Sequence, residues 1–167
     1  SGDVLLGIAP GSFGLLDFAG GTTGTFPASR KITVGDSGQG AVTLTSNASV
    51  SAGTVELGAT ATGSGSLSLE GSSTLSLAGP LCIGGTGTLV GGVGEVIVNS
   101  GATVFANAAS DSVLVWHDGG SLTVNAGGTL KAAGFLRVAG DMTLASGSLD
   151  VLALRFDPLP VGRTYDF

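Results

Sequence analysis

The sequence predicts an all-β fold, a three-faced right-handed parallel β-helix (β-solenoid) of about five coils. Three observations support this fold class. A short unit of alternating apolar residues recurs along the chain, its corners are rich in Gly, Ser and Asn, and no segment shows the apolar period of an α-helix. The right-handed sense is the general preference of crossover connections between parallel strands.

The recurring unit is clearest in five copies, which differ in sequence but keep one pattern. Each copy reads apolar-x-apolar, then a small or polar corner, then Ser or Thr before an apolar residue, as in VTLTSNASV (42–50). The copies begin at Val42, Leu67, Val96, Leu122 and Met142. Alternation of this kind is typical of a strand with one face in the core, and intervals of 20 to 29 residues have the size of a solenoid coil.

Each interval has room for three short strands, which gives the solenoid three faces. One strand precedes each unit, and these strands are predicted at residues 32–34, 55–57, 81–83, 113–116 and 135–138. Another strand follows each corner and begins at Val50, Leu75, Val104, Leu130 and Leu149. Gly, Ser, Asn and Asp at the corners fit tight turns in which the backbone takes positive φ.

A single domain over residues 1–167 fits the length of the chain. Within it, residues 31–155 carry the repeat coils, whereas residues 1–30 fit the repeat poorly and are expected to form an irregular first coil or a cap. Residues 156–167 leave the pattern at Asp157-Pro158 and are interpreted as a terminal extension or an artificial boundary.

Composition narrows the classes of function. The chain has 31 Gly without the period of collagen, one Cys, six Lys and Arg together, and a net charge of −6. So few basic side chains argue against binding of nucleic acid. No run approaches the roughly 20 apolar residues of a membrane span. The first residues lack the basic and apolar parts of an export signal, so such a signal is either absent or already removed.

Candidate catalytic and metal-binding motifs are incomplete. The segment 35–38, Gly-Asp-Ser-Gly, is similar to the nucleophile segment of chymotrypsin-like proteases, but the single histidine, His117, follows Ser37 instead of preceding it. Segments 84–89 and 91–96 begin like a calcium-binding nonapeptide repeat and lack its Asp at the sixth position. We therefore expect no catalytic residue, no cofactor, no metal site and no enzymatic activity.

The candidate contact residues lie on the outward side of the predicted strands. Stacking the copies places Thr43, Ser68, Ile97, Thr123 and Thr143 in one outward row, which is a ladder of hydroxyl groups with one apolar member. On the preceding face, alternation directs Glu56, Cys82, Leu114 and Arg137 outward. Leu114 and Ile97, together with the nearby Trp116, are the apolar side chains that we expect to offer contact surface.

The segment 119–154, GGSLTVNAGGTLKAAGFLRVAGDMTLASGSLDVLAL, resembles the β-helical passenger region of bacterial autotransporters and related repeat-bearing surface proteins. The likeness extends over roughly residues 30–155 and is one of pattern, without a functional motif. The resemblance implies export to the cell surface or the extracellular space, and roles in adhesion, self-association or display of other domains. It carries over no catalytic residue.

These observations favour a non-enzymatic exported surface protein, a structural or self-associating β-helix scaffold with an adhesive role. Its expected partner is a second copy of the chain or a surface, matrix or glycan component. Two alternatives stay open. An ice-binding solenoid needs a flat, regular Thr-x-Thr array, which Ile97, Glu70 and Ala145 interrupt on the candidate face. A carbohydrate-active β-helix enzyme needs several acidic, basic and aromatic residues on one face, and these residue types are scarce.

Overall fold

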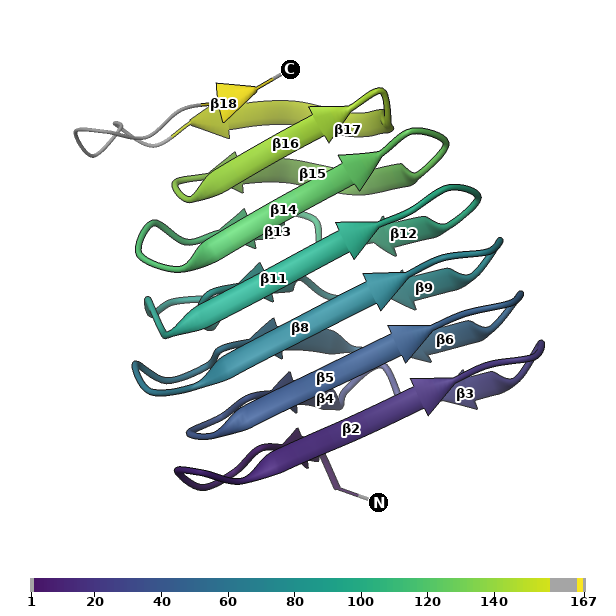
Figure 1. Cartoon of the computed structure of the whole chain (residues 1–167). Coiled ribbons are helices and arrows are strands. Elements are labelled where there is room, and N and C mark those ends of the chain that lie inside the picture. Colours follow the sequence, from purple (N-terminus) through teal and green to yellow (C-terminus); the bar gives the residue numbers. More distant parts are fainter. Residues whose placement is uncertain (1, 157–164, 167) are drawn as a thin grey trace.

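Short alternating segments form strands throughout the described part of the chain, and these strands stack in parallel as a β-solenoid (Figure 1). The computed structural model describes residues 2–156 and 165–166. Each coil contributes one strand to each of three sheet faces, named face 1, face 2 and face 3 in chain order. The expected all-β solenoid of about five coils is confirmed.

Each face is a ladder of parallel strands from successive coils. Face 1 pairs β1 (Val4–Leu6), β4 (Lys31–Val34), β7 (Thr54–Leu57), β10 (Leu81–Ile83), β13 (Asp111–Val115) and the second half of β15 (Thr129–Val138). Face 2 pairs β2 (Phe13–Phe18), β5 (Gln39–Leu44), β8 (Ser64–Leu69), β11 (Val93–Val98), β14 (Gly120–Asn125), β16 (Asp141–Ala145) and β18 (Tyr165–Asp166). Face 3 pairs β3 (Thr23–Thr25), β6 (Ser49–Ala52), β9 (Thr74–Leu77), β12 (Thr103–Ala106) and the first half of β15.

The last coils join face 3 to face 1 without a break. The strand β17 (Ser148–Phe156) runs parallel to β15 along its whole length, with a shift of register between Ala132 and Phe135. Both strands therefore turn the corner from face 3 to face 1, and the two faces form one continuous sheet.

Figure 1 shows the hand of the solenoid. The strands of face 2 run from left to right on the near side, the strands of face 3 lead back behind them, and the chain climbs from the N-terminus towards the C-terminus with each coil. The coil is therefore right-handed, as the crossover preference predicts.

Inward side chains of the three faces stack along the axis and form one core. Its buried members are mostly Leu, Ile and Val at the positions that the alternation predicts. On face 2, for example, Val42, Leu67, Val96 and Leu122 are direct neighbours in successive strands. Each side chain buried in this way stabilises the fold by about 1.5–3 kcal/mol.

The predicted strands are present, although several begin two or three residues earlier than expected, and two other differences stand out. β13 ends at Val115, so Trp116 lies outside the strand, where the chain turns into the corner. Residues 129–132 and 135–138 belong to one long strand, β15, because only two residues separate the two predicted segments.

The N-terminal segment is a coil in register with the next one. β1, β2 and β3 pair in parallel with β4, β5 and β6, so residues 4–25 continue the solenoid. At the other end, β18 pairs with β16. Most of residues 156–167 lie outside the described residues, and the interpretation of that segment stays a prediction.

The corner between face 1 and face 2 is built from glycine. One inward row at the start of the face 2 strands consists of Gly14, Gly40, Gly65, Gly94 and Gly120. A Cβ on Gly65 would lie 2.1 Å from the carbonyl oxygen of Val34, and one on Gly94 would lie 2.1 Å from the amide nitrogen of Gly84. These contacts leave no space for a side chain, so the backbones of the two faces pack directly against each other.

The corner between face 2 and face 3 turns through left-handed backbone. Ser46, Asn47 and Ser72 have φ of 53°, 66° and 61°, and Gly101 and Gly127 have φ of 80° and 77°. Gly and Asn adopt this conformation at the lowest steric cost. The expectation of positive-φ corners is confirmed.

Gly65→Ala is expected to destabilise the fold by about 1–3 kcal/mol, because the new methyl group meets backbone atoms that move only if the coil widens. The measurement is the free energy of unfolding in urea. Gly87→Ala is the matched control, because a Cβ at Gly87 meets no atom within 4 Å. Equal stabilities of the two variants would contradict the role of the glycine row.

Candidate binding surfaces

The outward row expected on face 2 is present in the structure. Thr43, Ser68, Ile97, Thr123 and Thr143 are direct neighbours in β5, β8, β11, β14 and β16. The row begins with Asp17 of β2, whose carboxylate accepts a hydrogen bond from the hydroxyl of Thr43. The register thus aligns these side chains on one surface, and their role as contact residues stays a prediction.

Face 3 carries a longer hydroxyl row, which we did not expect from the sequence. Its members are Thr23, Ser49, Thr74, Thr103, Thr129 and Ser148. Neighbours are spaced by the strand separation of about 4.8 Å. The signal was the Ser or Thr that precedes the apolar residue in each repeat copy, but only the strand register shows that these residues form one uninterrupted row.

A second outward row on face 3 changes character along the axis. Its members are Thr25, Ser51, Ser76, Phe105, Lys131 and Asp150. The first three carry hydroxyl groups. Beyond them, the ammonium group of Lys131 lies 5.7 Å from the ring centroid of Phe105 and 3.8 Å from the carboxylate of Asp150. The N-terminal half of this row is therefore neutral, and the C-terminal half is aromatic and charged.

The middle of the outward row of face 1 is buried, which corrects the expectation for Leu114 and Cys82. The register aligns Glu56, Cys82, Leu114 and Arg137 as predicted and adds Thr33, but Cys82 is 0% exposed and Leu114 is 4% exposed. Alternation determines the side of the sheet on which a side chain lies. Exposure depends in addition on the atoms packed around it, and Leu114 is therefore not available as a surface contact.

The charged group of this buried row, Glu56, pairs with Lys31 of the preceding coil. The ammonium group of Lys31 lies 2.8 Å from a carboxylate oxygen of Glu56, and this hydrogen bond raises the pKa of Lys31. Burial, together with the negative charge of Glu56, raises the pKa of the Cys82 thiol to about 12. The thiol is therefore protonated at neutral pH and is a poor nucleophile.

Trp116 supports a loop at the corner between face 1 and face 2. Its indole N–H donates a hydrogen bond of 2.7 Å to the carbonyl oxygen of Thr86, and the guanidinium of Arg137 lies 5.5 Å from its ring centroid. The supported loop is a short antiparallel turn in which Gly85 and Val90 form a bridge. The side chain is half-buried, and its role as a contact residue stays a prediction.

The candidate protease residues lie too far apart to act together. Ser37 and His117 occupy the same corner, three coils apart, which corresponds to about 14 Å along the axis. His117 lies beside Asp118, with 2.7 Å between Nδ1 and Oδ1. Across residues 2–156 and 165–166, no three His, Cys, Asp or Glu side chains group in a way that could hold a metal ion. In the same residues, no helix is long and apolar enough to cross a membrane.

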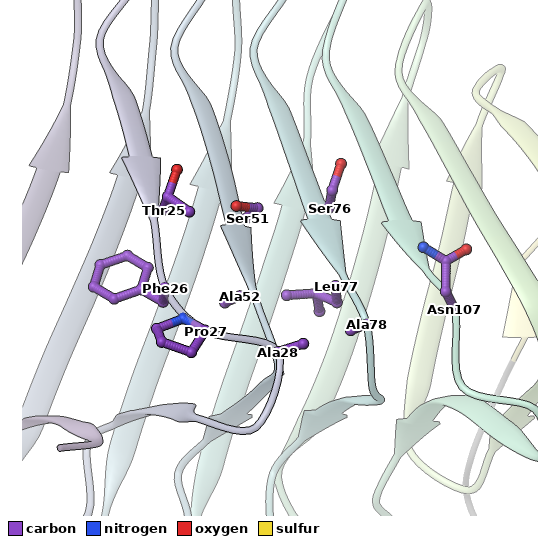
Figure 2. A pocket seen from close by; sticks show the side chains of 10 residues that line it. All are labelled: Thr25, Phe26, Pro27, Ala28, Ser51, Ala52, Ser76, Leu77, Ala78 and Asn107. Atoms are coloured by element: carbon purple, nitrogen blue, oxygen red, sulfur yellow. The ribbon is translucent and has the colours of Figure 1, made fainter. Parts of the chain in front are cut away.

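A pocket of about 450 Å³ lies where face 3 turns towards face 1 (Figure 2). Its floor and walls come from successive coils, and the lining residues are Thr25, Phe26, Pro27, Ala28, Ser51, Ala52, Ser76, Leu77, Ala78 and Asn107. Figure 2 shows the segment Pro27–Ala28 crossing from its own coil towards Ala78. No residue of this pocket was a candidate from the sequence, because the pocket depends on how loops of different length lie over neighbouring coils.

A short corner makes room for the segment that borders this pocket. A single residue, Gly53, separates β6 from β7, and a Cβ there would lie 2.2 Å from the carbonyl oxygen of Arg30 and 2.3 Å from that of Ala28. The segment 26–30 therefore packs directly on the backbone of the next coil. The ring of Phe26 is held in place by Phe18, with ring centroids 6.5 Å apart in an edge-to-face arrangement.

No family model, no curated protein and no solved structure matches this chain. The candidate surfaces are therefore judged from their own residues and geometry.

The thiol of Cys82 is expected to resist alkylation in the folded protein. At pH 9 an unfolded thiol with a pKa of 9.0 is half ionised, whereas a pKa of about 12 lowers the thiolate fraction by about three orders of magnitude. The measurement is the rate of labelling by iodoacetamide with and without urea. Equal rates would contradict the buried position of Cys82.

The same pKa shift predicts a pH dependence of stability. Because the pKa is higher in the folded state, the thiol's contribution is complete below about pH 9 and declines as the pH rises towards 12. As the pH rises from about 9 towards 12, the free energy of unfolding of Cys82→Ala is expected to fall less than that of the parent protein. A parallel decline in both proteins would contradict the shift.

Proposed function

We propose that this chain is the β-solenoid scaffold of an exported surface protein, which binds a surface or matrix partner through its lateral faces and has no catalytic role. The observation that carries the proposal is the unbroken hydroxyl row on face 3, from Thr23 to Ser148. The resemblance of segment 119–154 to autotransporter passenger regions supports the exported location.

The hydroxyl row suits adhesion because its spacing is set by backbone hydrogen bonds. Each strand of face 3 pairs with both neighbours between β6 and β15, so the side chains cannot drift relative to one another. A partner that engages several hydroxyl groups loses little additional conformational freedom for each new contact. Many weak and equally spaced contacts then add to a stable attachment.

The ice-binding alternative finds only partial support in the same face. The first three coils present hydroxyl pairs, as in Thr23 with Thr25. In the later coils Phe105, Lys131 and Asp150 replace one hydroxyl of each pair. A regular array therefore extends over only half of the face, and adhesion is the better supported function.

Introducing charge into the row is expected to weaken adhesion. The variant Thr103→Asp/Thr129→Asp places two carboxylates side by side, which a docked partner would have to desolvate, and we expect binding to immobilised matrix proteins or glycan-coated surfaces to fall about tenfold or more. The matched control is Ser100→Asp/Ala126→Asp, which adds the same charge to exposed corners of the same two coils.

Circular dichroism and thermal unfolding of both variants check that the fold is retained. Equal adhesion by the two charged variants would contradict a role of the face 3 row. Failure of the parent protein to adhere to any of these surfaces would contradict the proposed function as a whole.

Self-association is a second candidate function, favoured by exposed apolar side chains on the first coil. Leu5, Ile8, Phe13 and Leu15 are between 53% and 65% exposed. Phe13 and Leu15 both lie on the outward side of β2, which makes them neighbours on one surface. Apolar side chains gathered in this way are typical of protein contact surfaces.

The variant Phe13→Glu/Leu15→Glu is expected to keep the protein monomeric at concentrations at which the parent protein associates, because two charges would have to be buried in the contact. Sedimentation velocity over a wide concentration range measures the association. Leu89→Glu is the control, because Leu89 is 66% exposed and lies in the loop supported by Trp116. A parent protein that stays monomeric throughout would contradict this second function.

A further inference from the structure

We propose that the pocket between face 3 and face 1 is a binding site for a neutral saccharide unit. This inference rests on the proposed adhesive function and names the ligand class at one site. The pocket has a volume of about 450 Å³, which lies within the roughly 300–1,000 Å³ of small-ligand pockets.

The polar side of the pocket is a row of hydroxyl groups at regular spacing. Thr25, Ser51 and Ser76 are direct neighbours in β3, β6 and β9, so they are about 4.8 Å apart. Within the described residues, no hydrogen bond engages these three hydroxyls or the side-chain amide of Asn107. Figure 2 shows the three hydroxyl residues in one row, with Asn107 farther along the pocket. Together they supply hydrogen-bond donors and acceptors that the hydroxyl groups of a sugar can use.

An apolar part of the lining adjoins the hydroxyl row. It is formed by Phe26, Pro27 and Ala78, and Phe26 is held by its edge-to-face contact with Phe18. A pyranose ring has one face of C–H groups, which packs against apolar side chains, and a rim of hydroxyl groups, which needs hydrogen-bond partners. The pocket presents both kinds of surface within one site.

The charge of the lining residues favours a neutral ligand over an anionic one. None of the residues that line the pocket is ionisable. A uronate, a sialylated sugar or a phosphate would therefore enter without a cation to offset the loss of hydration. A purely apolar ligand would leave the hydroxyl row unpaired, which also costs free energy. A neutral sugar can form hydrogen bonds with the hydroxyl row and pack its C–H groups on the apolar residues, and it carries no charge that would lose its hydration.

The experiment screens the whole chain against neutral oligosaccharides of hexoses, 6-deoxyhexoses and N-acetylhexosamines, with oligogalacturonates as the charged comparison. Binding is then mapped by amide chemical shifts in an NMR titration. We expect a neutral oligosaccharide to shift the amides of the pocket, and the variant Ser51→Ala/Ser76→Ala to weaken binding about tenfold.

Ser66→Ala is the matched control, because Ser66 is a half-exposed serine on β8 of face 2, outside the pocket and outside the hydroxyl rows. It is expected to leave sugar affinity unchanged. A second variant, Ala78→Trp, fills the pocket from an exposed position and is expected to abolish binding without affecting the core.

The inference is overturned if no neutral oligosaccharide shifts the pocket amides, if galacturonates bind there more tightly, or if Ala78→Trp binds as well as the parent protein. If the parent chain adheres through the face 3 row while its pocket binds no sugar, only this inference fails. If the pocket binds a sugar but the chain adheres to no surface, the proposed function fails and the saccharide site stands.

Discussion

The direct backbone contact at the corner between face 1 and face 2 is the constraint on which the rest of the structure depends. Gly40, Gly65 and Gly94 occupy equivalent positions in successive coils, and each meets backbone at the end of a face 1 strand or in the corner that follows it, at a distance that no Cβ could tolerate. Because the same contact recurs, the strands of one coil start level with those of the next. Regular stacking of the coils, and with it the in-register ladders of all three faces, follows from this repeated close approach.

Register, once established, determines both the core and the surface. Inward positions become stacks of Leu, Ile and Val, and outward positions become rows in which small polar residues are repeated at the strand spacing. A chain with only 11% charged residues can therefore present an ordered polar surface, because the order comes from the backbone and not from ion pairs. Distinct sites arise where the regularity is interrupted, as at Gly53, where a short corner lets the segment 26–30 lie across the neighbouring coil and border a pocket.

Much of the fold, and less of the candidate surfaces, could be predicted from the sequence. Period-2 alternation and corner residues located the strands and the alignment of Thr43 with Ser68, because these are properties of neighbouring residues and of a constant coil. The burial of Cys82 and Leu114 could not be predicted in this way, since exposure depends on side chains contributed by other coils. Trp116 was expected as a contact residue, but its indole N–H donates a hydrogen bond to the carbonyl oxygen of Thr86, thirty residues away in the chain. This contact between coils could not be predicted from neighbouring residues either.

The sequence by itself determined the fold class, the three strands of each coil and the positive-φ corners, because local alternation and the tolerance of Gly and Asn for positive φ are encoded within a few residues. Only the tertiary structure decided which outward rows are open to solvent, that the hydroxyl row of face 3 is unbroken, and that Phe26 and Ser76 line a common pocket. Those features depend on the lengths of loops and on contacts between coils. Residues far apart in the chain meet there because the backbone of each coil packs on the one before it.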